Sequence, residues 1–137
     1  MNLDEAALLI KKHEGYSDKV YLDSVGVPTG GFGHAFLVGS PISSYVADAF
    51  FRADFREVID NYEYLNLGLD GVRRAVVLNM LFNLGLPKFL TFKNTIASLR
   101  AGKYKDASRH MMDSVWARQV VARATELSQM MENGAGI

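Results

Sequence analysis

The sequence contains no cysteine and only three prolines among its 137 residues. Without cysteine the fold cannot depend on disulfides, so packing must stabilise it, and a reducing cytosolic origin is permitted. No apolar run approaches the roughly 20 residues that a membrane-spanning helix needs, so no membrane insertion is expected. Because 49% of the residues are hydrophobic, the chain can bury a core of its own, and its length suits one domain.

The formal net charge is zero, but the charges are divided unevenly along the chain. Residues 1–70 hold 5 lysines and arginines against 11 acidic residues, and residues 71–137 hold 10 against 4. A basic half attracts an anionic polymer such as nucleic acid or a cell wall, while complementary halves of one fold explain the division equally well. The basic residues are scattered among the predicted helices rather than gathered on one reading helix, so no nucleic-acid partner is expected.

The N-terminal part of the chain predicts one helix followed by a small sheet. Apolar residues recur at helical spacing over residues 3–14 and predict one inward stripe, made of Leu3, Ala6, Ala7 and Ile10. Gly15 supplies the helix stop. Between residues 16 and 36, apolar residues are interleaved with glycines and a proline, which predicts a hairpin or three short strands with tight turns.

The remainder of the chain predicts a helical region. Its periodicity predicts helices over residues 43–64, 69–84, 94–101, 104–112 and 114–131. The first of these helices places on its apolar face the side chains of Val46, Ala49, Phe50 and Ala53. Residues 69–84 are apolar almost all round their second half, so we expect this helix at the centre of the core, with the single tryptophan, Trp116, as an anchor.

Together these elements predict an α+β architecture in one domain with two lobes. The small glycine-rich lobe spans about residues 15–42, and a connecting helix spans about residues 43–64. The helical lobe spans about residues 69–132, and the helix over residues 3–14 is expected to pack on it. A functional site is expected in a cleft between the two lobes.

Two carboxyl groups in contrasting settings stand near the predicted sheet. Glu14 closes the first helix on its inward stripe, where partial burial and the negative end of the helix dipole both favour a protonated carboxyl. Asp23 lies in the glycine-rich segment, where a solvated carboxylate stays ionised. Glycoside hydrolysis uses such a pair, one group to give a proton and the other to handle water or the developing cation. Taken alone, the pair is too common to establish a function.

The order of residues around this pair is more specific. Residues 14–23 read EGYSDKVYLD, and residues 26–34 read GVPTGGFGH. The pattern is glutamate, eight residues, aspartate, five residues and threonine, followed by Gly-aromatic-Gly-His, and it resembles the phage lysozymes of glycoside hydrolase family 24. The similarity continues through residues 71–85, 92–94 and 114–123, so it covers nearly the whole chain.

This resemblance implies a muramidase that cuts the β-1,4 bond between N-acetylmuramic acid and N-acetylglucosamine in bacterial peptidoglycan. It implies that Glu14 protonates the glycosidic oxygen and that Asp23 and Thr29 hold or activate the attacking water. It also implies inversion at the sugar carbon. An inverting pair of carboxyl groups stands roughly 6.5–9.5 Å apart, which leaves room for that water.

The resemblance also assigns supporting roles. An arginine at the place of Arg123 reaches the catalytic glutamate in the family. Family members bury a His-Asp pair, and Asp54 falls on the apolar face of its predicted helix, where a carboxylate needs a partner. We therefore predict that His34 and Asp54 meet and stabilise the fold.

Candidate substrate contacts come from both lobes. They are Phe82 and Asn94 in the helical lobe, and Gly30 and Phe36 in the small lobe. Gly30 stands where relatives more often carry a bulky apolar residue, which leaves the packing of the sheet open. The segment from His34 to Asp54 is shorter than in the longer family members, so the small lobe is trimmed.

Two other functions stay open at this point. A lytic transglycosylase needs the acid but no water-positioning aspartate, and a catalytically silent wall-binding or virion-structural domain needs neither group. No cofactor is expected, because the three histidines show no ligand spacing and no phosphate loop is present. A monomer is expected. Since the N-terminus is acidic where a signal peptide is basic, we expect the protein in the host cytoplasm before release to the periplasmic wall, or within a larger virion protein.

Overall fold

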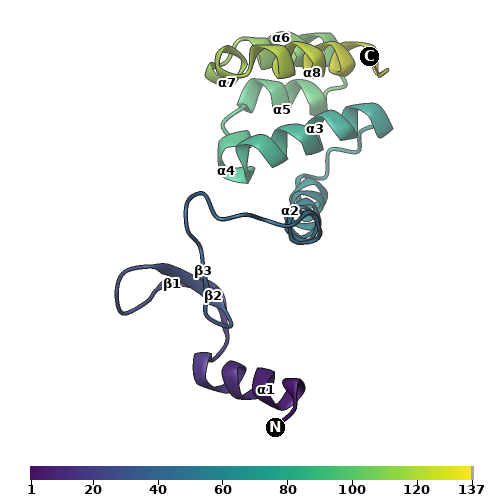
Figure 1. Ribbon diagram of the computed structural model, residues 1–137. Helices are drawn as coiled ribbons and strands as arrows, with labels where there is room; N and C mark the ends of the chain where they lie inside the picture. Colours follow the sequence, from purple (N-terminus) through teal and green to yellow (C-terminus); the bar gives the residue numbers. More distant parts are fainter. Residues whose placement is uncertain (137) are drawn as a thin grey trace. The chain divides into compact units, whose positions relative to one another are not determined.

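The computed structural model describes residues 1–136, which fall into two compact units. The first unit is Met1–Ser44, and the second begins at Tyr45. Figure 1 shows the first unit as one helix and a small sheet, and the second as a set of helices. Both kinds of secondary structure are therefore present in the α+β arrangement expected from the sequence.

Helix α1, Leu3–Glu14, has the bounds that the sequence predicts. A capping box starts it: the Glu5 amide donates to the Asn2 side chain at 2.8 Å, and the Asn2 amide donates to the Glu5 carboxylate at 3.2 Å. It ends at Gly15, whose φ of 71° few other residues adopt. These local signals define the helix and place Glu14 in its last turn.

The predicted inward stripe of α1 is not buried within this unit. No residue of the helix is buried, and Leu3 and Ile10 are 89% and 61% exposed. The physical reason is that its own unit offers α1 only a three-stranded sheet of short strands, which has too little apolar surface to cover a helix face. The packing of α1 on the helical lobe stays a prediction.

The sheet of the first unit has three antiparallel strands in the order β1-β2-β3. They are β1 Ser17–Leu22, β2 Pro28–Gly31 and β3 His34–Ala35. Leu22 pairs with Pro28 at the start of β2, where a proline is tolerated in a strand. The three-strand alternative predicted from the glycine-rich segment is thus the observed one.

Helix α2, Ser44–Leu65, confirms the helix predicted over residues 43–64, but its buried face differs from the prediction. The four residues of the predicted apolar face are all exposed. The buried residues are Val58, Tyr62 and Leu65, near the C-terminal end of the helix. The Tyr62 hydroxyl accepts a hydrogen bond from the Leu69 amide at 3.2 Å, which fixes the turn into the next helix.

Helix α3, Gly71–Leu84, lies at the centre of the core of the second unit, as predicted. Val76, Val77 and Met80 are completely buried. Around them pack side chains from the other helices of this unit, among them Phe89, Leu99, Met111, Trp116, Ala124 and Met131. Trp116 is 4% exposed and donates from Nε1 to Asn83 at 2.7 Å, so it is the core anchor expected from the sequence.

The C-terminal helices depart from prediction at two places. Helices α5, Lys93–Arg100, and α6, Tyr104–Met112, agree with the sequence, whereas the short helix α4, Leu86–Phe89, is not predicted by it. The region predicted as one helix over residues 114–131 is instead two, α7 Val115–Gln119 and α8 Val121–Asn133. No helix of residues 1–136 is long and apolar enough to cross a membrane.

Arg73 joins three helices of the second unit. Its guanidinium donates to the carbonyls of Met131 and Glu132 at the end of α8 at 2.7 and 3.0 Å. It also lies 3.8 Å from the ring centroid of Tyr104 and pairs with the Asp70 carboxylate at 2.8 Å. The guanidinium thus satisfies backbone carbonyls at the C-terminal end of α8 that have no partner within the helix. A cation at this end is also favoured by the helix dipole.

We expect Asp70→Ala to lower the free energy of unfolding by about 1 kcal/mol at pH 7, because Asp70 is the N-cap of α3. The hydrogen bond from the Arg73 amide lowers the pKa of Asp70 most. Desolvation opposes it, and the side-chain hydrogen bond and the charge of Arg73 lower the pKa further, so the net direction is downward. A lowered folded pKa gives stability that is present above the unfolded pKa and lost as the pH falls through the folded pKa. Urea unfolding at pH 7 and pH 3 should therefore show a smaller loss for the variant at pH 3.

Asp70→Asn is the matched control, since asparagine keeps the cap and removes the charge. It should unfold with nearly the wild-type midpoint at pH 3 and with a weaker dependence on pH. An unchanged pH dependence in this variant would contradict the assignment to Asp70.

Candidate functional site

The Glu14 carboxyl lies beside the turn between β2 and β3. Although Glu14 is exposed, its side chain approaches the backbone of Gly33 closely: a Cβ placed on Gly33 would stand 2.5 Å from Glu14 Oε2. The fold of the first unit therefore brings this carboxyl against the sheet. The deeper burial predicted for Glu14 is not found within this unit.

Phe32 in the same turn ties α1 to the sheet. The Tyr16 ring lies 5.2 Å from the Phe32 ring between centroids, and the Lys11 ammonium lies 4.9 Å from the Phe32 centroid. Both distances are within the range of aromatic and cation–π contacts. Lys11 and Tyr16, on either side of Glu14 in the sequence, thus contact the β2–β3 turn against which the Glu14 carboxyl lies.

Asp23 is held at the turn between β1 and β2. Its Oδ1 accepts hydrogen bonds from the Val25 and Val27 amides at 2.9 and 2.8 Å. These two backbone hydrogen bonds fix the orientation of the Asp23 side chain in the turn. Within residues 1–136 no group bonds to Oδ2, so this oxygen is available to a water molecule.

Thr29 is buried in β2, the central strand, with 6% of its surface exposed. Its hydroxyl donates to the Val27 carbonyl at 2.8 Å. Because that proton is already engaged, the remaining capacity of Oγ1 is to accept a hydrogen bond.

Asp23 and Thr29 are linked through a single residue. The Val27 amide donates to Asp23, and the Val27 carbonyl accepts from Thr29. The structure thus brings these two predicted residues together at one turn, and all three members of the predicted triad lie in the first unit. Two groups able to accept hydrogen bonds from water, in the same unit as a carboxyl that could give a proton, are a set of residues suited to acid-assisted hydrolysis.

Gly30 is buried beneath the ring of Phe36. A Cβ on Gly30 would lie 3.2 Å from Phe36 Cε2, with the Lys19 carbonyl oxygen and Val20 Cα at 3.6 and 3.7 Å. The aromatic ring therefore fills the space that a bulky side chain at position 30 would take. This contact explains how the sheet packs with a glycine at position 30, where relatives more often carry a bulky apolar residue.

We expect Gly30→Val to lower the free energy of unfolding by about 1–3 kcal/mol, the usual cost of overpacking. Thermal unfolding followed by circular dichroism measures the change. Phe36→Ala removes the ring, so it should destabilise the Gly30→Val protein less than it destabilises the wild type. Equal effects of Phe36→Ala in the two backgrounds would show that the two positions are not coupled.

His34 in β3 is exposed and contacts Phe36 edge to face, with ring centroids 4.9 Å apart. Asp54 lies in α2 and is also exposed. Since the two residues belong to different units, their predicted pairing stays a prediction.

In the second unit, Arg123 on α8 is held by Asn79 on α3. Its Nε donates to Asn79 Oδ1 at 2.8 Å, beside an apolar hollow of about 330 Å³. The aromatic residues lining this hollow are Phe51, Phe55 and Phe82. Phe82 is 42% exposed and packs against Phe51 with centroids 5.6 Å apart. The predicted contact of Arg123 with Glu14 joins different units and stays a prediction.

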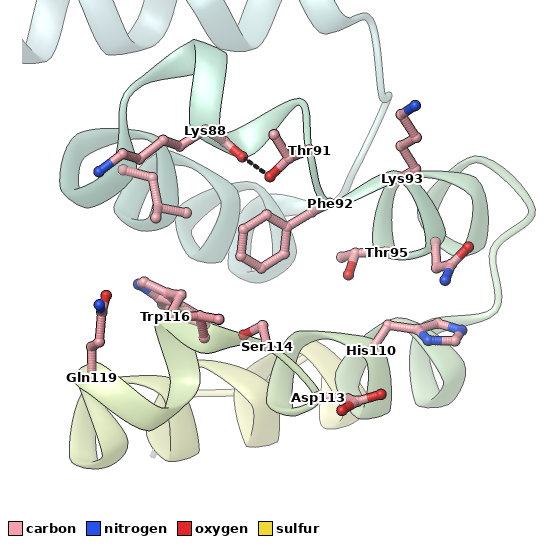
Figure 2. A pocket seen from close by; sticks show the side chains of 13 residues that line it. Lys88, Thr91, Phe92, Lys93, Thr95, His110, Asp113, Ser114, Trp116 and Gln119 are labelled. Atoms are coloured by element: carbon pink, nitrogen blue, oxygen red, sulfur yellow. Dashed lines mark hydrogen bonds between the residues drawn. The ribbon is translucent and has the colours of Figure 1, made fainter.

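A larger cavity has a volume of about 430 Å³, and Asn94 is one of its lining residues. Figure 2 shows this cavity from close by. Figure 2 shows Phe92 and Trp116 facing each other in this region, and their ring centroids are 6.1 Å apart in an edge-to-face contact. Charged and titratable groups also line it, namely Lys88, Lys93, His110 and Asp113. The sequence alone does not single out these four residues, because each stands alone along the chain and only the folding of α4 to α7 gathers them.

Residues 1–136 contain no cluster of three or more histidine, aspartate or glutamate side chains able to hold a metal ion. The candidate triad itself presents two carboxyl groups and one hydroxyl, with backbone amides at the β1–β2 turn.

A small sheet together with a larger helical unit is the architecture of the lysozyme fold. A comparison with protein families gives a match to phage lysozyme over residues 11–129, and the chain belongs to that family. It is a lysozyme-type glycoside hydrolase, and its substrate is bacterial peptidoglycan.

Relatives of known description agree with this membership. The chain is 26% identical to "Probable T4-type lysozyme 1" of Dictyostelium discoideum, over 93% of this chain and 72% of the relative. It is 23% identical to "Probable T4-type lysozyme 2" of the same organism, over 82% of this chain and 72% of the relative. It is also 25% identical to the pre-baseplate central spike protein Gp5 of Enterobacteria phage T4, over 93% of this chain but only 28% of that longer protein.

Proposed function

We propose that this protein is a muramidase that hydrolyses the β-1,4 bond between N-acetylmuramic acid and N-acetylglucosamine, with Glu14 as the general acid. The observation that supports this role most directly is the position of the Glu14 carboxyl. It ends α1, it lies against the β2–β3 turn, and it shares one unit with Asp23 and Thr29. The reaction requires one carboxyl to give its proton to the leaving oxygen.

Asp23 and Thr29 position the attacking water in this proposal. Asp23 Oδ2 takes the proton of the water, and Thr29 Oγ1 accepts a second hydrogen bond from it, since its own proton is bonded to the Val27 carbonyl. Attack from the face opposite the leaving group inverts the sugar carbon. The Glu14 and Asp23 carboxyls are then expected roughly 6.5–9.5 Å apart in the working enzyme.

The remaining site residues act around this centre. We propose that Gly30, Phe36, Phe82 and Asn94 contact the substrate. Arg123 is proposed to reach Glu14, and His34 is proposed to pair with Asp54 and stabilise the fold. The place of Asn94 in the lining of a cavity supports a substrate contact, and the hydrogen bond of the Arg123 guanidinium to Asn79 supports a role for a positioned cation.

Two routes of delivery fit this activity. In one, the enzyme stays in the host cytoplasm until it is released to the periplasmic wall. In the other, the domain acts from a virion. The similarity to a central spike protein of phage T4 supports the second route.

Analysis of the products tests the bond and the stereochemistry. Purified peptidoglycan digested by the protein should give reducing N-acetylmuramic acid ends, and proton NMR at early times should show the α-anomer. Anhydro-muramic ends would instead identify a lytic transglycosylase, and reducing N-acetylglucosamine ends would identify cleavage of the other bond. Absence of any product would favour the wall-binding alternative.

A further inference from the structure

Gly33, in the turn between β2 and β3, lies in contact with the Glu14 side chain. A Cβ on this residue would stand 2.5 Å from Glu14 Oε2, 2.9 Å from Cδ and 3.2 Å from Cγ. Distances below 3.0 Å essentially do not occur for real Cβ atoms. The carboxyl of Glu14 therefore occupies the volume that any side chain at position 33 would need.

The other glycines of the first unit have different surroundings. A Cβ on any of Gly15, Gly26, Gly31 and Gly39 would meet nothing within 4 Å, and one on Gly30 would meet Phe36. At Gly33 the nearest three atoms all belong to the flexible end of one side chain, that of Glu14. An alanine Cβ at position 33 would accordingly displace the carboxyl, because the three atoms nearest to it all belong to Glu14.

We propose that Gly33 is a positioning residue for the reaction, and that its missing side chain determines where the Glu14 carboxyl lies. The inference rests on the proposed role of Glu14 as general acid. The turn that carries Gly33 is itself held to α1 by the contact of Phe32 with Lys11, and Phe32 also contacts Tyr16 just after the helix. Displacing a proton donor by about 1 Å can slow a reaction about 100-fold. A single methyl group at position 33 is therefore expected to lower the rate of hydrolysis.

The test compares Gly33→Ala with Gly39→Ala in hydrolysis of purified peptidoglycan. Both glycines have positive φ, 75° and 87°, so alanine brings the same kind of backbone strain at each place. Only alanine at position 33 meets the Glu14 carboxyl. We expect kcat to fall about 100-fold in Gly33→Ala with little change in KM, and both constants to stay near wild type in Gly39→Ala.

A second background separates a steric effect on Glu14 from a general defect. Glu14→Asp shortens the side chain by one methylene and withdraws the carboxyl from position 33. In that background, already slower, the added Gly33→Ala should lower kcat by no more than about threefold. A role of Gly33 in the backbone alone would give the same factor in both backgrounds.

Several outcomes overturn the inference. They are equal losses in Gly33→Ala and Gly39→Ala, equal factors for Gly33→Ala in the wild-type and Glu14→Asp backgrounds, or failure of both Gly33→Ala proteins to fold while Gly39→Ala folds. Folding of the double variant alone would support it, because relief of the clash restores the fold. Full activity of Glu14→Gln would instead contradict the proposed function, and so the two failures are distinguishable.

Discussion

Glu14→Gln is expected to lower kcat for peptidoglycan hydrolysis about 1,000-fold, within the roughly 10²–10⁴ range typical of a lost general acid. Glutamine keeps the shape of the side chain and its contact with Gly33, but it has no carboxyl proton to give to the glycosidic oxygen. Because Glu14 is exposed and forms no buried ion pair in its unit, the melting temperature should stay close to that of the wild type. Release of soluble muropeptides and thermal unfolding measure the two quantities.

Glu126→Gln is the matched control for this experiment. Glu126 is an exposed glutamate on α8, outside the candidate triad, so its substitution removes the same charge without removing the proposed proton donor. It should leave kcat near the wild-type value. If Glu14→Gln retains more than about a tenth of the activity, Glu14 is not the general acid.

The first helix illustrates how far local sequence signals reach. Asn2, Glu5 and Gly15 determine the ends of α1 through hydrogen bonds and backbone conformation, so the bounds are predictable residue by residue. The inward stripe is a different kind of prediction, because burial depends on a partner surface. The short sheet of its own unit does not provide one, and periodicity alone does not reveal this.

The region after α3 shows where breaks in helices escape prediction. A proline commonly follows the end of a helix, but Pro87 lies in the first turn of α4, a position that its ring and missing N–H favour. Between α7 and α8, Val120 has φ −127° and ψ 58°, and no glycine or proline marks this break. Tertiary packing determines both the helix α4 and the break between α7 and α8, and the local sequence does not predict either.

The spacing of Glu14, Asp23 and Thr29 predicts these residues as the site, and the structure places all three in one unit, while their roles stay predictions. The contacts of these residues are not predictable from the spacing. The connection of Asp23 and Thr29 through Val27 requires the geometry of the β1–β2 turn. The contact of Glu14 with Gly33 joins residues nineteen positions apart, which no local pattern encodes.

Phe89 lies in α4, the helix that the sequence does not predict. Phe89→Ala is expected to lower the free energy of unfolding by about 3–5 kcal/mol. Phe89 is completely buried in the core of the second unit, and its ring stacks on Phe92 with centroids 6.3 Å apart. Removing the ring leaves a void that close-packed neighbours fill only in part, so lost burial and lost contacts add. Urea unfolding of the purified protein measures the change.

Leu90→Ala provides the comparison one residue away. Leu90 is 42% exposed, so its truncation removes a side chain of similar chemistry with little core disturbance, and the expected loss is about 1 kcal/mol or less. Phe89→Leu should fall between the two, since leucine refills part of the void. Phe92 also contacts Trp116, and both line the cavity that contains Asn94, a proposed substrate contact; if Asn94 has that role, Phe89→Ala should additionally weaken binding of muropeptide fragments. Similar losses of stability for Phe89→Ala and Leu90→Ala would show that α4 does not contribute to the core.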